Sequence, residues 1–204
     1  MKRVCPRCGS KDTAPIMYGL PCFDDELRRK LNNHEIALGG CCIDGGEPEY
    51  RCFCCHKDFG APPIIHSEQG SKSYLDSVNA IRFSDGGYPD GYWEISIQRN
   101  ESSINLDVCP NSIEGLHFRR EMSEEEWHGL IWSLYMDLLL HEWKRSYNNP
   151  DILDGEQWEL EICLMDGHKR LYHGSNAFPP LWTDLVALFR PYLQEADAAL
   201  EKER

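Results

Sequence analysis

Cys5-Pro6-Arg7-Cys8 lies near the start of the chain, and Cys52-Phe53-Cys54-Cys55 repeats its cysteine spacing much later. Each stretch is a CxxC pair, and a short turn that carries two thiolates suits one side of a tetrahedral ion. Two such turns supply four sulfur ligands, which complete the coordination of Zn²⁺. The sequence therefore predicts a zinc ribbon whose metal ligands are Cys5, Cys8, Cys52 and Cys55.

A site with four thiolates is closed, because it leaves no coordination position for water or a substrate. The predicted zinc is therefore structural and does not make the protein an enzyme. A redox-active CxxC pair is the alternative interpretation. It needs only one pair and normally lies on a thioredoxin-like βαβ unit, which the pattern of residues 1–60 does not indicate.

Three further thiols lie close to these pairs, at Cys41, Cys42 and Cys54. Adjacent residues on a strand point to opposite faces, so Cys41 and Cys42 are not both expected to bind one ion. One of them packs beside the metal or replaces a ligand, and the role of Cys54 stays open.

Charge is distributed unevenly along the 204 residues, whose formal net charge is −13. Residues 1–65 contain nine Lys/Arg and nine Asp/Glu, whereas residues 66–204 contain twelve and twenty-five. Ala61-Pro62-Pro63 disfavours both helix and strand, which places a boundary there. We expect a first domain over residues 1–62 and a second, acidic domain over residues 66–204.

The sequence favours a cytoplasmic protein. Met1-Lys2-Arg3-Val4 precedes the first CxxC pair without the apolar region of a signal peptide. The most apolar stretch, residues 130–140, is interrupted by Ser133 and Asp137, so no membrane span is expected. In a reducing compartment ten cysteines are not expected to form a disulfide framework, which favours metal binding.

CPRCGS at Cys5–Ser10, GGCCID at Gly39–Asp44 and YRCFCCHKDF at Tyr50–Phe59 follow one another in the first sixty residues. Together they resemble a zinc-ribbon module of small, mostly uncharacterised bacterial proteins. The resemblance implies a ribbon fold and a bound metal, and no particular activity. DGEQW at Asp154–Trp158 and GSNAFP at Gly174–Pro179 are similar to patterns in other uncharacterised bacterial proteins.

Between the two CxxC pairs, the pattern predicts a helix over residues 24–31, with an acidic start and a basic end that suit the helix dipole. Short strands are expected over residues 16–19, 35–43 and 50–53. This segment has few apolar residues and can therefore bury little surface. We expect metal binding to supply part of the free energy that stabilises its fold.

Alternation of apolar and polar residues predicts an antiparallel sheet after residue 72. Its strands are expected over residues 78–83, 93–98, 104–108, 115–119, 158–164 and 169–173, with a turn-rich connection over residues 148–155. Ser123-Glu124-Glu125-Glu126 is a capping box that opens a helix expected to reach Ser146. A last helix begins near Pro180, is kinked or ended by Pro191, and is followed by a fraying tail. The sequence therefore predicts an α+β fold, with a small four-cysteine zinc ribbon followed by a two-layer domain of antiparallel sheet and two helices.

Apolar residues on the first of these helices cover more than one face. Such a helix is either buried on two sides or exposes an apolar strip to a partner, and burial is the favoured interpretation. All six tryptophans follow residue 90, where they suit a core or a protein interface.

No catalytic motif is recognisable. His141-Glu142 lacks the second histidine of HExxH. His173 is the histidine of most interest, because it borders a loop that would form a pocket with Trp158, Ser175 and Asn176.

These observations favour a structural zinc-binding protein that is not an enzyme and binds another protein. The alternative is a nucleic-acid-associated factor that uses its ribbon, although a neutral ribbon beside an acidic domain suits phosphate poorly. Its basic surface would consist of Arg3, Arg7, Lys11, Arg28, Arg29 and Lys30.

Overall fold

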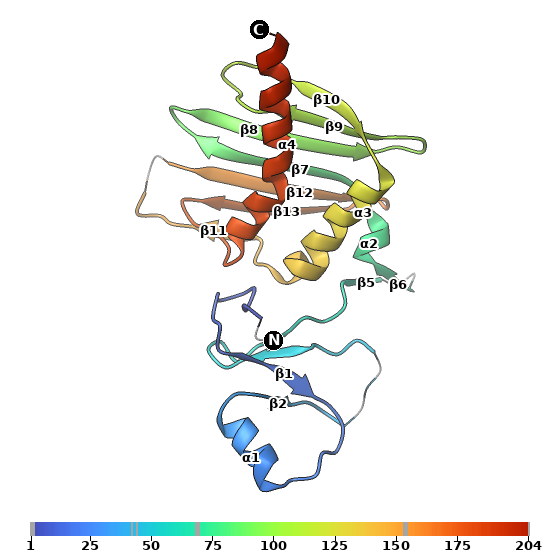
Figure 1. Cartoon of the computed structure of the whole chain (residues 1–204), viewed down its shortest axis with the longest axis vertical. Coiled ribbons are helices and arrows are strands. Elements are labelled where there is room, and N and C mark those ends of the chain that lie inside the picture. The colour runs from blue at the N-terminus through green and yellow to red at the C-terminus, as the bar shows by residue number, and fades with distance from the viewer. Residues whose placement is uncertain (1–2, 42, 44, 68–69, 153–154, 204) are drawn as a thin grey trace.

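The structure is built on two main β-sheets, which lie one beyond the other along the long axis of the molecule (Figure 1). The computed structural model describes residues 3–41, 43, 45–67, 70–152 and 155–203. A small N-terminal sheet lies at one end of the elongated molecule, and a seven-stranded sheet with two long helices lies at the other. None of the described helices is long and apolar enough to cross a membrane.

The N-terminal sheet is centred on β1 (Thr13–Met17). This strand pairs in parallel with β2 (Ala37–Leu38) and antiparallel with β3 (Tyr50–Cys52), and β4 (Asp58–Phe59) adds to β3. The expected strand over residues 35–43 is therefore much shorter than predicted. It ends at Leu38, although the Gly39 N–H still donates to the Met17 carbonyl at 2.8 Å, and a Cβ atom on Gly39 would lie 2.4 Å from the Tyr18 ring.

α1 (Asp25–Asn32) connects β1 to β2 and confirms the helix expected over residues 24–31. The side chain of Asp24 caps it by accepting the N–H of Leu27 at 2.8 Å. Asp25 and Glu26 lie in its first turn and Arg29 and Lys30 in its last, as the helix dipole favours.

The large sheet has the strand order β10-β9-β8-β7-β12-β13-β11. Neighbouring strands are antiparallel except β11, which runs parallel to β13. The turn-rich connection expected over residues 148–155 thus begins within a strand that the sequence did not predict. The strands are β7 (Val78–Gly87), β8 (Gly91–Arg99), β9 (Ile104–Cys109), β10 (Phe118–Met122), β11 (Ser146–Asn148), β12 (Gln157–Leu164) and β13 (Lys169–Ser175).

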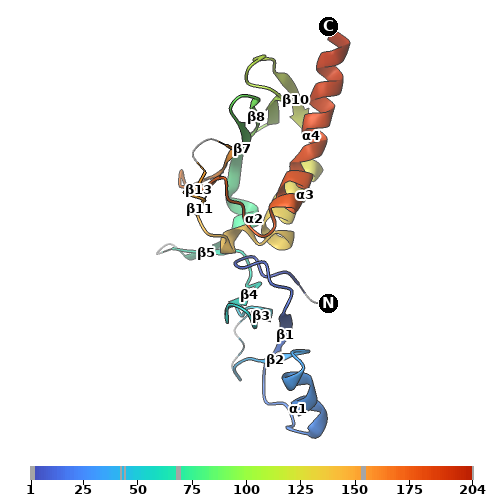
Figure 2. The same ribbon diagram turned by 90° about the vertical axis from the view of Figure 1, so that its left-hand side faces the viewer.

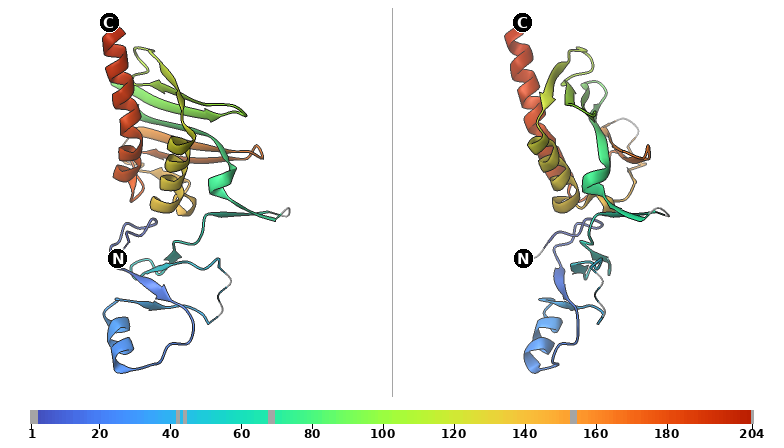
Figure 3. Two further views of the ribbon diagram at one scale, coloured as in Figure 1. Left: turned by 45° about the vertical axis from the view of Figure 1, so that its right-hand side comes forward. Right: turned by 90° about the vertical axis from the view of Figure 1, so that its right-hand side faces the viewer.

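α3 (Glu124–Trp132) and α4 (Trp182–Glu203) both cover one face of this sheet, and the other face is left open (Figures 2 and 3). The alternating strand residues that face the helices are buried, among them Phe83, Ile95 and Leu160, each 0% exposed. The predicted two-layer α+β class is confirmed. A hairpin of β5 (Ile64–Ser67) and β6 (Gly70–Ser73), followed by α2 (Tyr74–Ser77), joins the two sheets.

The helix expected to reach Ser146 is shorter. The Ser123 hydroxyl accepts the Glu126 N–H at 3.1 Å, as predicted for the capping box, but the Glu126 carboxylate binds Arg120 rather than reaching back. After Trp132 the chain continues as a π-helical turn, η1 (Ser133–Asp137). Leu139 then adopts a left-handed conformation with φ 52°, which ends the helix before the short 3₁₀ turn η2 (Leu140–Glu142).

α4 continues through Pro191 to Glu203, so the expected fraying tail is helical. Phe189, Tyr192 and Ala196 on either side of the proline are buried against the sheet, and this packing offsets the hydrogen bond that proline removes. Arg120 adds a clamp, because its guanidinium binds Glu195 on α4 at 3.0 Å as well as Glu126 on α3 at 2.7 Å.

The buried face of β7 includes one carboxyl group, that of Asp85. Asp85 is only 7% exposed and pairs in register with Trp93 on β8 and Trp158 on β12. Burial, together with the charge and the hydrogen bond of Glu156, raises the pKa of Asp85 to about 7. The folded state therefore holds a proton between about pH 4 and pH 7 that the unfolded chain releases, and stability falls as pH rises through that range.

We expect Asp85→Asn to stabilise the fold at pH 8, because the amide cannot ionise. The gain is on the order of 2 kcal/mol at pH 8 and shrinks towards pH 4. Urea unfolding of both proteins at pH 4.5 to 8 measures it. Asp76→Asn, at an exposed position on α2, is the matched control and should show no such pH dependence. A gain that is independent of pH would contradict the assignment.

Candidate functional site

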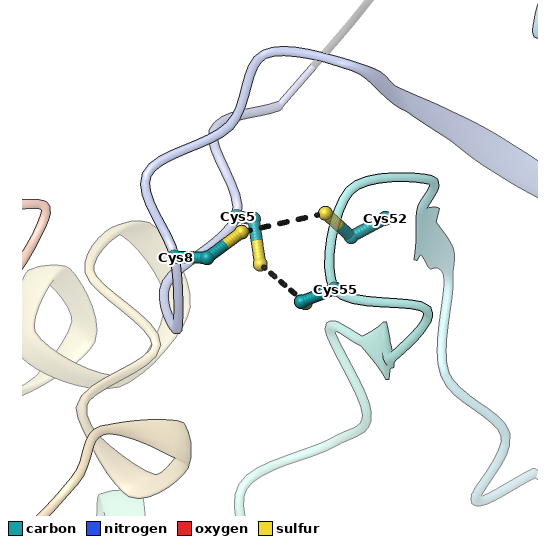
Figure 4. Close-up of side chains that lie close together, drawn as sticks. All are labelled: Cys5, Cys8, Cys52 and Cys55. Atoms are coloured by element: carbon teal, nitrogen blue, oxygen red, sulfur yellow. Dashed lines mark hydrogen bonds between the residues drawn. The ribbon is translucent and has the colours of Figure 1, made fainter.

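Two turns of the same design bring the four predicted cysteines together at the inner end of the N-terminal sheet (Figure 4). Their sulfur atoms all lie within 4.8 Å of one another. The Sγ atoms of Cys5 and Cys55 are 3.8 Å apart, and those of Cys8 and Cys52 are 3.6 Å apart. A disulfide requires about 2.05 Å, so these thiols are not bonded in pairs.

The sulfur spacing fits a tetrahedral ion. With metal–sulfur distances of about 2.3 Å, the edges of a tetrahedron of thiolates are about 3.8 Å long. The measured separations lie close to that value. The four side chains are therefore placed to hold one metal ion, and four soft sulfur donors suit zinc among the divalent metals.

Backbone N–H groups point at a sulfur atom in the same way in each turn. The N–H groups of Arg7 and Cys8 donate to the Cys5 sulfur, and those of Cys54 and Cys55 donate to the Cys52 sulfur. The residue after each CxxC pair is left-handed, with φ 74° at Gly9 and φ 57° at His56. The local sequence thus builds the same hydrogen-bonded loop twice.

Burial and these N–H donors act in opposite directions on the thiol pKa values. Burial raises the pKa of Cys5 to about 12 and raises that of Cys55. Burial acts on Cys52 too, but the N–H groups of Cys55 and Cys54 and the neighbouring thiols bring its pKa below the usual value. A cation at the centre would favour the thiolate form of all four groups.

One side of the cysteine cluster is covered by the C-terminal part of the chain. Leu139, 3% exposed, packs with Cys5, Cys52 and Phe59 in a small apolar core of their own. A leucine with positive φ is strained by about 1–2 kcal/mol, so this burial must offset the strain. The left-handed turn after η1 thus places a side chain against the candidate metal site.

Polar contacts hold the same junction together. The Arg3 guanidinium donates to the carbonyl oxygens of Met136 and Asp137, at the end of η1. The Glu142 carboxylate, 8% exposed, accepts the Gly60 N–H at 2.6 Å and faces Arg7 at 3.8 Å. These contacts satisfy helix-end carbonyls and a buried carboxylate, so they attach the N-terminal part to the end of η1 and to η2.

His141 also lies at this junction. Its Nε2 atom is 3.1 Å from the Ala61 carbonyl oxygen, to which it donates, and burial lowers the pKa of its imidazole. His141 is therefore a neutral structural group.

The remaining described cysteines take no part in the cluster. Cys54 is exposed although it lies between two ligand positions. Cys41 is exposed and lies outside any strand, so the argument that placed it on a strand does not apply. Cys42 lies outside the described residues. The metal-ligand geometry found among the described residues consists of Cys5, Cys8, Cys52 and Cys55.

The basic residues that would bind nucleic acid are mostly paired within the protein. Arg3 and Arg7 contact the C-terminal part, as described above. On α1, Arg29 binds Glu35 at 2.7 Å and Lys30 binds Glu26 at 2.7 Å, and Arg28 lies 3.8 Å from Asp25. Four of the six expected basic residues thus lie within 4 Å of a carboxylate, whereas Arg3 binds carbonyl oxygens and Lys11 is exposed.

A hollow of about 380 Å³ lies beside His173 on the open face of the sheet. It is lined by Trp158, His173 and Ser175, as expected, and not by Asn176. Asn176 has a left-handed backbone conformation, with φ 50°, and its side-chain amide donates to the Ile152 carbonyl. Both features are typical of an asparagine that stabilises a turn. The strand register places His173 opposite Ser146 and Glu159, but no hydrogen bond joins these three described side chains.

No protein-family model matches this chain, and no curated protein matches its sequence.

We expect Leu139→Ala to loosen the N-terminal part, because it opens the apolar cover of the cysteine cluster. The cost is about 2–4 kcal/mol, and amide hydrogen exchange should accelerate in residues 50–60. Leu139→Gly should be milder than Leu139→Ala by about 1 kcal/mol, since glycine accepts the left-handed conformation without strain. In an ordinary helix the order of these two substitutions is reversed.

Leu171→Ala, at a 40%-exposed position on the open face of β13, is the control. Equal acceleration in the Leu139 and Leu171 variants, or a worse effect of glycine than of alanine at Leu139, would contradict this account of the junction.

Proposed function

We propose that this chain is a structural zinc-binding protein without catalytic activity that binds another protein. In this proposal a zinc ribbon over residues 1–62 is followed by an acidic α+β domain over residues 66–204. The observation that supports the proposal most directly is the separation of the four cysteine sulfur atoms, 3.6 and 3.8 Å within the two measured pairs. Four thiolates at that spacing close the coordination shell of one ion.

Metal binding by the four cysteines would stabilise the fold of the N-terminal part. The N-terminal part buries few large side chains, and its small core consists of cysteines, Phe59 and a leucine supplied by the C-terminal part. An ion held by Cys5 and Cys8 on one turn and by Cys52 and Cys55 on the other would supply the missing cohesion.

The nucleic-acid alternative is less well supported, because most of the basic residues of the N-terminal part are engaged in ion pairs and hydrogen bonds. An enzymatic function around the hollow beside His173 is a second candidate. It would require a substrate to draw Ser146, His173 and Glu159 into hydrogen-bonding distance.

The metal proposal predicts about one zinc per purified chain by elemental analysis. Cys52→Ser should abolish stoichiometric zinc binding and unfold the N-terminal part, since a closed site loses most of its affinity with one ligand. The C-terminal sheet has its own core and should stay folded, which would show as a separate melting transition. Cys54→Ser is the matched control and should retain zinc. Loss of zinc in the Cys54 variant, or stoichiometric iron in the unaltered chain, would refute the ligand set or the metal.

The partner proposal is tested by affinity capture of the intact protein from a lysate of its own source, with and without nuclease. A stoichiometric protein that survives nuclease treatment is the expected result. Recovery of nuclease-sensitive material alone would replace it with the nucleic-acid alternative.

A further inference from the structure

Two neighbouring hollows at one end of the large sheet share Pro110 in their linings. The first has a volume of about 390 Å³ and lies beside the turn that joins β7 to β8. The second has a volume of about 270 Å³ and lies between the connection that follows β9 and the last turns of α4. None of the described residues that line either hollow is Lys, Arg or His.

The first hollow combines aromatic rings with carboxylates. Tyr88, 89% exposed, and Trp93 line it together with Asp90 and Glu156. An aromatic face attracts an organic cation through its quadrupole, and a carboxylate adds charge-assisted hydrogen bonds. This pairing suits a guanidinium group better than a metal ion.

Asp85 places a second carboxyl group next to Glu156, although Asp85 does not itself line either hollow. Asp85 is 7% exposed, and Glu156, whose negative charge acts on Asp85, lines the first hollow. The Oδ1 atom of Asp85 is buried without a hydrogen-bond partner among the described residues. A cation bound beside Glu156 would reduce the repulsion between these two carboxyl groups.

The second hollow is lined by both carboxylates and apolar side chains. Glu114, Asp197 and Glu201 contribute carboxylates, and Leu116 and Leu200 contribute apolar surface. The methylene chain of a basic residue packs on such surface while its charged end meets the carboxylates. Asp197 and Glu201 lie in the C-terminal half of α4, so the dipole of this helix adds to the attraction for a cation.

Metal ions are a poor match for these carboxylates. Among the described residues, the one group of side chains placed to hold a metal ion consists of the four cysteines. The net charge of −13 and the lining of the two hollows therefore favour a partner with organic cations.

We propose that the two hollows bind neighbouring basic side chains, arginine in particular, of an extended segment of a partner protein. The aromatic hollow holds one guanidinium group between Trp93, Tyr88 and Glu156, and the acidic hollow holds a second basic side chain near Asp197 and Glu201. This inference rests on the proposed protein-binding function and identifies the class of partner and the surface used.

The experiment is titration of the full-length protein with a tetra-arginine peptide, followed by calorimetry and tryptophan fluorescence at 150 mM salt. A tetra-citrulline peptide, which keeps the shape and lacks the charge, should not bind. Glu156→Gln and Asp197→Asn should each weaken binding about fivefold to tenfold. Tyr88→Ala should weaken it about twofold to fivefold, as expected for a cation–π contact at an exposed ring.

Glu121→Gln is the matched control, because it removes the same charge from an exposed position on β10, outside both hollows. It should change binding less than twofold. Equal weakening by Glu121→Gln and Glu156→Gln would reduce the effect to net charge and overturn the proposal, as would the absence of peptide binding. Capture of a partner protein that is unaffected by Glu156→Gln would also overturn it, while the proposed protein-binding function would stand.

Discussion

The convergence of four sulfur atoms on one point is the constraint on which the N-terminal half of the structure depends. It ties a loop at residues 5–8 to a loop at residues 52–55, and β1 and β3 pair between them. The apolar core of this part is small and contains Cys5, Cys52, Phe59 and Leu139, so strand pairing and ion pairs such as Arg51–Asp58 supply much of the remaining cohesion. The C-terminal half has no such dependence, because its sheet and two helices bury a large continuous core.

Local patterns predicted much of this arrangement. The CxxC spacing identified the four cysteines that meet, because two residues between cysteines suit a single tight turn. Alternation predicted most strands of the large sheet, since each has one buried and one open face, as in Trp158, Leu160 and Ile162. The capping box located the start of α3 through the Ser123 hydroxyl.

The sequence interpretation failed where distant contacts outweigh local preference. In the sequence pattern, Leu139 is one more apolar residue of a predicted helix. In the structure it adopts a left-handed conformation, and its side chain packs against cysteines more than eighty residues earlier in the chain. Pro191 reads as a helix end, but its helix is held to the sheet on both sides of it. β11 is too short to show alternation and exists because β13 offers an unpaired edge. The aromatic hollow and the acidic hollow could not be predicted either, because their linings combine residues from a turn, a loop and the end of a helix.

The position of Leu139 has a consequence for the order of events during synthesis. Ribosomes add residues from the N-terminus, so the last of the four cysteines, Cys55, is made well before Leu139. At ordinary elongation rates the interval is on the order of ten seconds. Throughout it, the cysteine cluster is exposed on the side that Leu139 later covers. A metal ion would therefore have access to the cluster from that side during translation, whereas in the folded chain the exposed side, at Cys8, is the one that remains open.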